Sequence, residues 1–494
     1  MPYRAVAFCP GLVATVGRRK SRRFFIESGD EFMKNSIGTI LTLAAWSLAV
    51  SPGSLRAAAD PAAGWKAGAA RVDTTPTGPV RMAGYASRTS PSEGVAHPLA
   101  AKALALADAA GHRVVLVTCD IIDLRRPLSG RVANRVEAEH GLARADLVLF
   151  ASHTHAGPQP VDPDEPAREG FEANVAYTRG LEDKLVLVVG AALAKMQPAA
   201  VTYGVGRAHF ALNRREPTPR GIKLGKNPAG PTDESVPVLQ VRDAVGKPLA
   251  VVFGYACHNT TLRPDMMKID ADFAGYAQDR VEADNLGTTA MFVTGCAGDA
   301  DPHPFGTTEM ARGHGEELAS AVKFVLDRPA RLSPLTGPLR AAYTETTLHF
   351  AGPTDRGVYE KLLGDPDQGR RRHAGRMIEA IDQGKPIRKD YPHYSAQAIA
   401  LGDRLTLVAL SGEVVVDYAI RLQEELGGEG RPLWVAAYAN DVVGYIPSVR
   451  VLKEGGYEGG ESFYGSTWPA PWAEDVESIV IGAAHDVVEK VRQK

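Results

Sequence analysis

The sequence is poor in cysteine. Four cysteines occur in 494 residues, and one of them, Cys9, lies in the N-terminal stretch. A disulfide-rich secreted scaffold is thereby excluded, because such chains carry roughly 8–10% cysteine. Two hypotheses remain for the other three. Cys257 and Cys296 form one bridge and leave Cys119 free, or all three are buried free thiols.

The chain after residue 60 also lacks a long basic run. Once residues 1–59 are set aside, 48 basic and 55 acidic side chains remain, a net charge near −7. This mildly acidic protein offers no electrostatic footprint for nucleic acid or for an anionic membrane surface. A small molecule or a lipid is the expected substrate, and the sequence does not specify an oligomeric state.

No confident membrane span is present in the sequence. The apolar stretch Ile37–Val50 is interrupted and shorter than the roughly 20 residues that a spanning helix needs. It follows the positively charged Met33–Asn35 and precedes the small residues Ala57–Ala59, which is the pattern of a secretory signal peptide. A twin-arginine signal at residues 22–23 is the competing interpretation. We therefore expect residues 1–59 to be removed and the mature protein to be secreted or periplasmic.

From Gly64 onward, short apolar runs alternate with amphipathic stretches. This alternation predicts a mixed α/β fold. No internal repeat or composition shift divides the chain, so residues 60–494 are expected to form one large domain. The expected elements are buried strands at Val114–Asp120, Leu147–Ser152, Leu249–Tyr255 and Ala290–Thr294, helices at Gly130–His140, Tyr177–Lys195 and Trp472–Arg492, a hairpin turning at Gly402-Asp403, and long loops at Asn213–Asp233 and, around a short helix, Gly364–Tyr394.

Two histidines follow an apolar strand in the segment Ser152–Pro158, which reads SHTHAGP. If strand geometry persists through His153 and His155, a period of two points both imidazoles to one side, where they can share a metal or divide metal binding and proton transfer. Two solvated histidines at a loop start are the alternative. His258 also ends an apolar run, and the glycine-rich turn Gly295–Pro302 follows another buried strand.

These segments belong to a longer series of motifs. The series comprises Gly84-Tyr85, His97-Pro98-Leu99, Ser152–Pro158, Asn213-Arg214, Ala256-Cys257-His258, Asp272 with Gly275-Tyr276, Gly298-Asp299 with Pro302, Gly412-Glu413, Asn440, Gly444-Tyr445-Ile446 and Tyr457-Glu458-Gly459-Gly460. In content and order, from about residue 66 to 470, it resembles the catalytic domain of the neutral/alkaline ceramidases. The resemblance implies a single α/β catalytic domain of neutral ceramidase type. Ceramidases usually continue into a C-terminal immunoglobulin-like domain, so this chain looks like a short bacterial member.

The resemblance also implies a metal site. In the family, zinc is held by two histidines, a glutamate and a tyrosine, which match His153, His258, Glu413 and Tyr445 of this chain. Imidazole and carboxylate groups suit Zn²⁺, and a phenolate becomes a reasonable ligand once the cation lowers its pKa. The alternatives are that Glu413 is a carboxylate in the first turn of a helix and that Tyr445 is a core aromatic residue.

The same comparison implies that His155 transfers protons and that Arg214 orients substrate or stabilises an oxyanion. Where the family has serine before Pro302, this chain has Asp301. That carboxylate can act as a general base, bind a cationic or hydroxylated substrate, or simply stabilise a turn. The expected activity is zinc-dependent hydrolysis of the acyl amide bond of ceramide or a related N-acyl lipid. This activity would belong to sphingolipid metabolism. Alternatives are an ester, a lactone or a non-lipid amide as substrate, or a family member that binds metal without catalysis.

Overall fold

The computed structural model describes residues 64–166, 168–352 and 354–493. The predicted signal peptide and the domain boundary at residue 60 lie outside these ranges and stay predictions. Strands and helices are mixed along the described chain, so the predicted α/β fold is confirmed. Within these ranges, no helix combines the length and the apolar character needed to cross a bilayer.

The larger of the two main sheets has nine strands. Most neighbours are antiparallel, but β10–β11 and β3–β4 are parallel. The order is β11 (Thr289–Thr294), β10 (Pro248–Tyr255), β9 (Ser235–Asp243), β5 (Gln197–Arg207), β1 (Lys66–Asp73), β2 (Ala100–Ala107), β3 (Arg113–Cys119) and β4 (Leu147–Ala151), with β13 (Ser333–Leu335) also paired to β5. The four predicted buried strands are all present, each shifted by at most one residue.

The second main sheet has four strands. They are β14 (Leu339–His349), β15 (Asp390–Leu401), β16 (Leu405–Leu410) and β18 (Leu433–Ala436), in that order. The predicted hairpin joins β15 to β16, and Gly402 at its turn has φ of 68°, which glycine adopts without steric cost.

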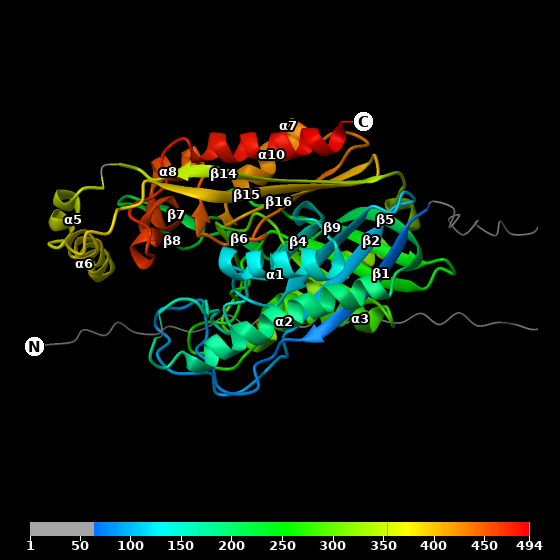
Figure 1. The fold of residues 1–494 in the computed structure, drawn as a ribbon, viewed down its shortest axis with the longest axis horizontal. Helices are drawn as coiled ribbons and strands as arrows, with labels where there is room; N and C mark the ends of the chain where they lie inside the picture. Colours follow the sequence, from blue (N-terminus) through cyan, green and yellow to red (C-terminus); the bar gives the residue numbers. More distant parts are fainter. Residues whose placement is uncertain (1–63, 167, 353, 494) are drawn as a thin grey trace, which may run out of the picture. The chain divides into compact units, whose positions relative to one another are not determined.

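The two sheets pack face to face and are covered by helices on their outer sides (Figure 1). The nine-stranded sheet is covered by α1 (Arg126–His140), α2 (Glu172–Ala194), α3 (Asp272–Asp284) and α4 (Thr308–Leu326), and the four-stranded sheet by α7 (Val416–Leu426) and α10 (Val476–Arg492). Strand side chains alternate between these layers. Leu104 and Leu106 of β2 face the second sheet, whereas Ala103 and Ala105 face the helices. Because both faces are buried, the strands are continuously apolar.

The remaining elements lie between the strands and helices already named along the chain. They are η2 (Arg144–Asp146), β6 (Ala211–Asn213), β7 (Arg215–Thr218), β8 (Gly221–Leu224), β12 (Ala300–Pro302), η3 (Pro329–Arg331), α5 (Arg356–Leu362), α6 (Gln368–Asp382), β17 (Glu413–Val414), β19 (Tyr445–Ile446), α8 (Val449–Glu454), α9 (Gly456–Gly459) and η4 (Glu461–Gly465). Two predicted loops need correction. Residues 213–233 contain the β7–β8 hairpin, and residues 364–394 contain the four-turn helix α6 and the start of β15.

Candidate metal centre

The centre forms where the two edges of the nine-stranded sheet approach each other. Thr294 at the end of β11 donates its hydroxyl hydrogen to the carbonyl of Ala151 at the end of β4, at 2.9 Å. The segment after β18 also joins both edges. The amide of Ala437 donates to Thr294, and the amide of Ala151 donates to Tyr438. This junction brings residues that follow β4, β10 and β16 into one place.

His153 and His155 converge, but not in the way the sequence predicts. Strand β4 ends at Ala151, and His153 has φ of 62°, so strand geometry does not persist through the pair. A non-glycine residue in this region is uncommon and needs support from its surroundings. The left-handed turn nevertheless brings the two Nε2 atoms to 3.2 Å from each other.

Backbone carbonyls fix the tautomers of two histidines. His153 donates from Nδ1 to the carbonyl of Ile122 at 2.7 Å, and His258 donates from Nδ1 to Ala297 at 2.7 Å. In the neutral imidazole, a proton on Nδ1 leaves a lone pair on Nε2. Metal-ligating histidines in proteins are commonly oriented by hydrogen bonds of this kind.

Glu413 and Tyr445 lie side by side because β17 and β19 form a two-residue parallel pair, in which these residues are partners. Glu413 is therefore in a strand and not in the first turn of a helix. Its Oε2 lies 3.2 Å from Nε2 of His153 and 3.1 Å from Nε2 of His258. The hydroxyl of Tyr445 lies 3.3 Å from Nε2 of His258. The four predicted ligands thus face one point.

This donor set fits a cation. Two imidazole lone pairs face a carboxylate oxygen at hydrogen-bond distance with no proton assigned between them, an arrangement that positive charge stabilises. Nitrogen and oxygen donors of this kind are those that Zn²⁺ accepts.

His155 offers a second way to complete a metal site. Its ligand nitrogen and those of His153 and His258 lie within 4.8 Å of one another, so the three histidines could hold a metal ion without Glu413. His155 differs from the other two, however. Its buried Nδ1 has no hydrogen-bond partner among the described residues, so nothing there fixes its tautomer.

The environment of His155 keeps it neutral. Burial, with His153 and His258 nearby, holds the pKa of its imidazole well below the usual range. Its ring packs edge-on against Tyr85 with 5.0 Å between centroids. Gly84 has φ of 90°, and a Cβ built there falls 2.5 Å from Nδ1 of His155. Glycine at this position therefore makes room for the imidazole.

Arg214 is held by several acceptors at once. Nε donates to Glu458 at 2.7 Å and Nη1 to Asp301 at 3.0 Å, while Nη2 donates to the carbonyl of Gly298 at 2.7 Å and to the hydroxyl of Tyr445 at 3.0 Å. A guanidinium has five N–H donors. Among the described residues, one N–H on Nη1 is left without an acceptor. Arg214 thus orients Tyr445 and keeps one donor uncommitted.

Asp301 lies on β12, which pairs with β6 next to Arg214. Its Oδ1 accepts hydrogen bonds from Arg214 and, at 3.2 Å, from the hydroxyl of Thr260. Burial raises its pKa, but Arg214 and His258 outweigh this, so the pKa lies below its usual value. Asp301 is therefore an ionised carboxylate beside the four converging groups.

The sequence did not reveal the supports of Arg214. Glu458 lies in a motif to which the sequence assigns no role, and Arg215 is predicted only as a neighbour of Arg214. Glu458 pairs with Arg214 through one oxygen and with Arg215 through the other, at 2.8 Å. Their distance along the chain hides this relation. The only local feature is that two arginines are adjacent in one segment and that a glutamate lies in the other, which does not by itself predict an ion pair.

The three described cysteines do not support the disulfide hypothesis. Cys119, Cys257 and Cys296 are all buried and unbridged within the described part of the chain. The alternative prediction of buried thiols is therefore correct. Burial raises the pKa of each thiol well above its usual value, which makes them unreactive.

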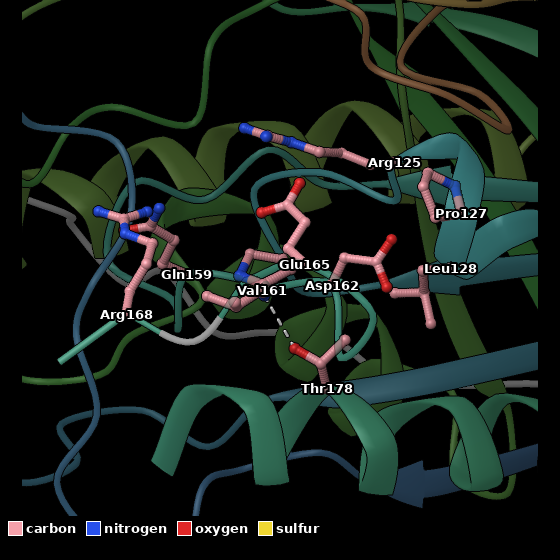
Figure 2. Close-up of a pocket in the computed structure, with 10 residues that line it drawn as sticks. Arg125, Pro127, Leu128, Gln159, Val161, Asp162, Glu165, Arg168 and Thr178 are labelled. Carbon is pink, nitrogen blue, oxygen red and sulfur yellow. Dashed lines mark hydrogen bonds between the residues drawn. The ribbon is translucent and has the colours of Figure 1, made fainter. Parts of the chain in front are cut away.

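A separate hollow lies beside α1 and α2 (Figure 2). In it, the amide of Val161 donates to the hydroxyl of Thr178 at 3.0 Å. Its lining is Arg125, Pro127, Leu128, Gln159, Pro160, Val161, Asp162, Glu165, Arg168 and Thr178. The converging groups are not part of this lining, so the hollow is distinct from the metal centre.

Comparison with known proteins identifies the family. Residues 65–314 match the family described as neutral/alkaline non-lysosomal ceramidase, N-terminal, and the chain belongs to this family. Relatives include neutral ceramidase A of Dictyostelium discoideum, 24% identical over 231 residues, which cover 45% of this chain. Neutral ceramidase B of the same organism is 24% identical over 212 residues, or 40% of this chain. The matched stretches span 32% and 29% of these relatives' own lengths.

The fold is also shared with solved structures. Neutral ceramidase from Pseudomonas aeruginosa superposes with a TM-score of 0.66 at 20% identity, covering 87% of this chain and 74% of that one. A ceramidase complexed with C2 gives the same score and identity and covers 75% of that chain. At this identity the likeness establishes the architecture. The predicted family and fold are thus confirmed.

Proposed function

We propose that this protein is an exported, zinc-dependent hydrolase that cleaves an acyl amide bond in ceramide or a related N-acyl lipid. The observation that carries the proposal is the convergence of two imidazole nitrogens, a carboxylate and a phenol on one point, within a chain of the neutral/alkaline ceramidase family. The signal-peptide pattern before residue 60 supports export.

In this proposal His153, His258, Glu413 and Tyr445 hold the ion. Zinc in such a site supplies Lewis acidity, which polarises a carbonyl group and makes water a stronger acid. The chain itself prepares the ligands. The Ile122 and Ala297 carbonyls orient the two imidazoles, and Arg214 orients the phenol of Tyr445.

His155 is the proposed proton-transfer group. Its Nε2 lies next to that of His153, and its neutral imidazole accepts a proton from attacking water and returns it to the leaving nitrogen. The uncommitted N–H of Arg214 is suited to donate to the carbonyl oxygen, where negative charge develops during attack. Proton transfer and charge stabilisation are thus assigned to different side chains.

A second candidate, hydrolysis of an ester, lactone or non-lipid amide by the same groups, is favoured by Asp301. A carboxylate beside the centre changes the charge that a substrate meets, so ceramide is one member of the substrate class to be tested. A metal-binding protein without catalysis is the remaining alternative, in which Asp301 marks the loss of activity.

The test is a comparison of substrates on protein with measured zinc content. Hydrolysis of a fluorescent short-chain ceramide is measured beside p-nitrophenyl esters and lactones, for the wild type, Glu413→Gln and the exposed helix control Glu424→Gln. We expect ceramide hydrolysis by the wild type and the control but not by E413Q. Turnover of esters or lactones alone favours the second candidate. A zinc-loaded wild type that is inert on the whole panel contradicts both.

A further inference from the structure

Only one of the two carboxylate oxygens of Asp301 accepts hydrogen bonds from the described residues. Both hydrogen bonds that it accepts, from Arg214 and from Thr260, go to Oδ1. Oδ2 has no hydrogen-bond partner among the described residues, and the side chain is 21% exposed. One oxygen is therefore anchored in place while the other is accessible.

No described cation forms a hydrogen bond or ion pair with this oxygen. Arg214 and Arg215 face three carboxylates, those of Asp301, Glu454 and Glu458. Among these five side chains the carboxylates outnumber the guanidinium groups by one. Arg263, a further cation close to Asp301, lies with its guanidinium 3.5 Å from the ring centre of Phe305. An accessible carboxylate oxygen in such a cluster attracts hydrogen-bond donors and cations.

Asp301 is also rigidly coupled to the metal centre. The carbonyl of Ala300, its neighbour on β12, accepts the hydrogen bond of the His258 amide at 2.9 Å. Arg214 contacts both Asp301 and Tyr445, so one guanidinium fixes the carboxylate relative to the phenol. A group bound by Oδ2 is thereby held at a set position relative to the converging groups.

We propose that Asp301 is a specificity-determining residue, which selects substrates with an ammonium or hydroxyl group and rejects those with a carboxylate. The inference rests on the proposed amide hydrolysis. In an N-acyl lipid the acyl chain is apolar, so the recognised group lies in the amine part. Asp301 acts on substrate choice, while His155 and the metal ligands act on the bond that breaks.

Three substrates of matched length test this proposal. They are the lauroyl amides of ethylenediamine, ethanolamine and glycine, whose amine parts end in a cation, a hydroxyl and an anion. For the wild type we expect kcat/KM to fall in that order, with the cationic amide preferred over the anionic one by about tenfold or more, the scale of a partly exposed charge pair.

Variants locate the preference in Asp301. Asp301→Asn should reduce the ratio of cationic to anionic kcat/KM toward one, while Asp301→Glu, which keeps the charge, should retain the order. Asp265→Asn is the matched control, because it removes an exposed carboxylate that forms no hydrogen bond with Arg214 or Thr260. The control should leave the ratio unchanged.

The outcomes separate the two proposals. Equal kcat/KM for all three amides in the wild type overturns the role of Asp301 even if a variant does not fold, and so does an unchanged ratio in folded D301N. If the zinc-loaded wild type hydrolyses none of these amides and no ceramide, the proposed function fails, and the selectivity inference fails with it.

Discussion

Arg214 and Glu458 form an ion pair with 2.7 Å between Nε and Oε1, although 244 residues separate them along the chain. Both side chains are buried, at 7% and 1% exposure. The other oxygen of Glu458 binds Arg215, which is 1% exposed. Because Arg214 also holds the hydroxyl of Tyr445, this pair connects a supporting network to the proposed metal ligands.

Substitution of Glu458 should therefore destabilise the protein. Glu458→Gln removes the buried carboxylate that Arg214 and Arg215 share, and breaking a buried ion pair costs about 3–5 kcal/mol. We expect the free energy of unfolding, measured by urea denaturation with circular dichroism, to fall by about that amount.

Glu454→Gln is the matched control for E458Q. Glu454 also pairs with Arg215, at 3.1 Å, but its side chain is 34% exposed. A partly exposed pair contributes about 0–1 kcal/mol, so E454Q should unfold close to the wild type. Equal losses in the two variants would show that burial does not make the Arg215–Glu458 pair more important for stability than the Arg215–Glu454 pair.

Zinc content should distinguish the two overlapping donor sets. If Glu413 is a ligand and His155 transfers protons, Glu413→Gln and His258→Gln lose zinc, whereas His155→Gln keeps it and loses about 10²–10⁴-fold in kcat. Zinc per chain is measured by mass spectrometry after dialysis. A zinc-free H155Q beside a zinc-loaded E413Q would assign the site to the three histidines instead.

Gly84 should be required for activity because of the space it leaves. In Gly84→Ala, the added Cβ meets the His155 ring at 2.5 Å, and the backbone must keep φ of 90°, so the imidazole is displaced. Misplacement of a catalytic group by about 1 Å can cost ~10²-fold in rate. We expect a fall in kcat of that order with zinc content retained, measured on the substrate that the wild type cleaves.

Gly78→Ala provides the control for G84A. A Cβ at Gly78 meets no atom within 4 Å, and its φ lies outside the positive region. This variant should keep wild-type kcat. Wild-type activity in G84A would show that the position of the His155 ring does not limit the reaction.

The His97–Asp279 pair should make stability depend on pH. His97 Nε2 lies 2.9 Å from Asp279 Oδ2. Burial lowers the pKa of His97, but Asp279 outweighs it, so the net pKa is raised above 6.5. Burial raises the pKa of Asp279, but His97 outweighs it, so the net pKa lies below 3.8. The contribution of His97 to the free energy of unfolding is therefore complete below pH 6.5, and it is lost as the pH rises through the pKa of His97 in the folded protein.

Asp279→Asn tests this window. Because the side chain of Asp279 is 52% exposed, the substitution should lower the free energy of unfolding at about pH 6 by about 1 kcal/mol or less. This loss should shrink at about pH 9, where His97 is neutral in both proteins. Urea denaturation at both pH values measures the difference, and a loss that grows with pH would refute the assignment.

Much of the fold follows from local patterns. Strands such as Leu147–Ala151 are buried on both faces, so they are uninterrupted apolar runs that are easily recognised. The β7–β8 hairpin has no recognisable sequence pattern, because its strands contain one buried residue and are rich in proline, glycine and charge, so apolar and polar residues do not alternate. Helix α6 was underestimated for a similar reason, since only three of its residues are buried.

Only part of the candidate metal site can be predicted from local sequence patterns. Spacing pointed to His153 and His155, but their convergence depends on a left-handed residue that no local pattern announces. Glu413 and Tyr445 were found through family resemblance alone, because a two-residue strand pair has no sequence signature. Their ligand roles stay predictions until metal content is measured.

The pairing of β17 with β19 has a consequence for engineering. The region that matches the family model, residues 65–314, contains both imidazoles, while Glu413 and Tyr445 lie beyond it. A designer who transplants either stretch into another scaffold carries only half of the proposed metal ligands. Neither stretch can form the site by itself, because the four groups come together only in the folded structure of the whole domain.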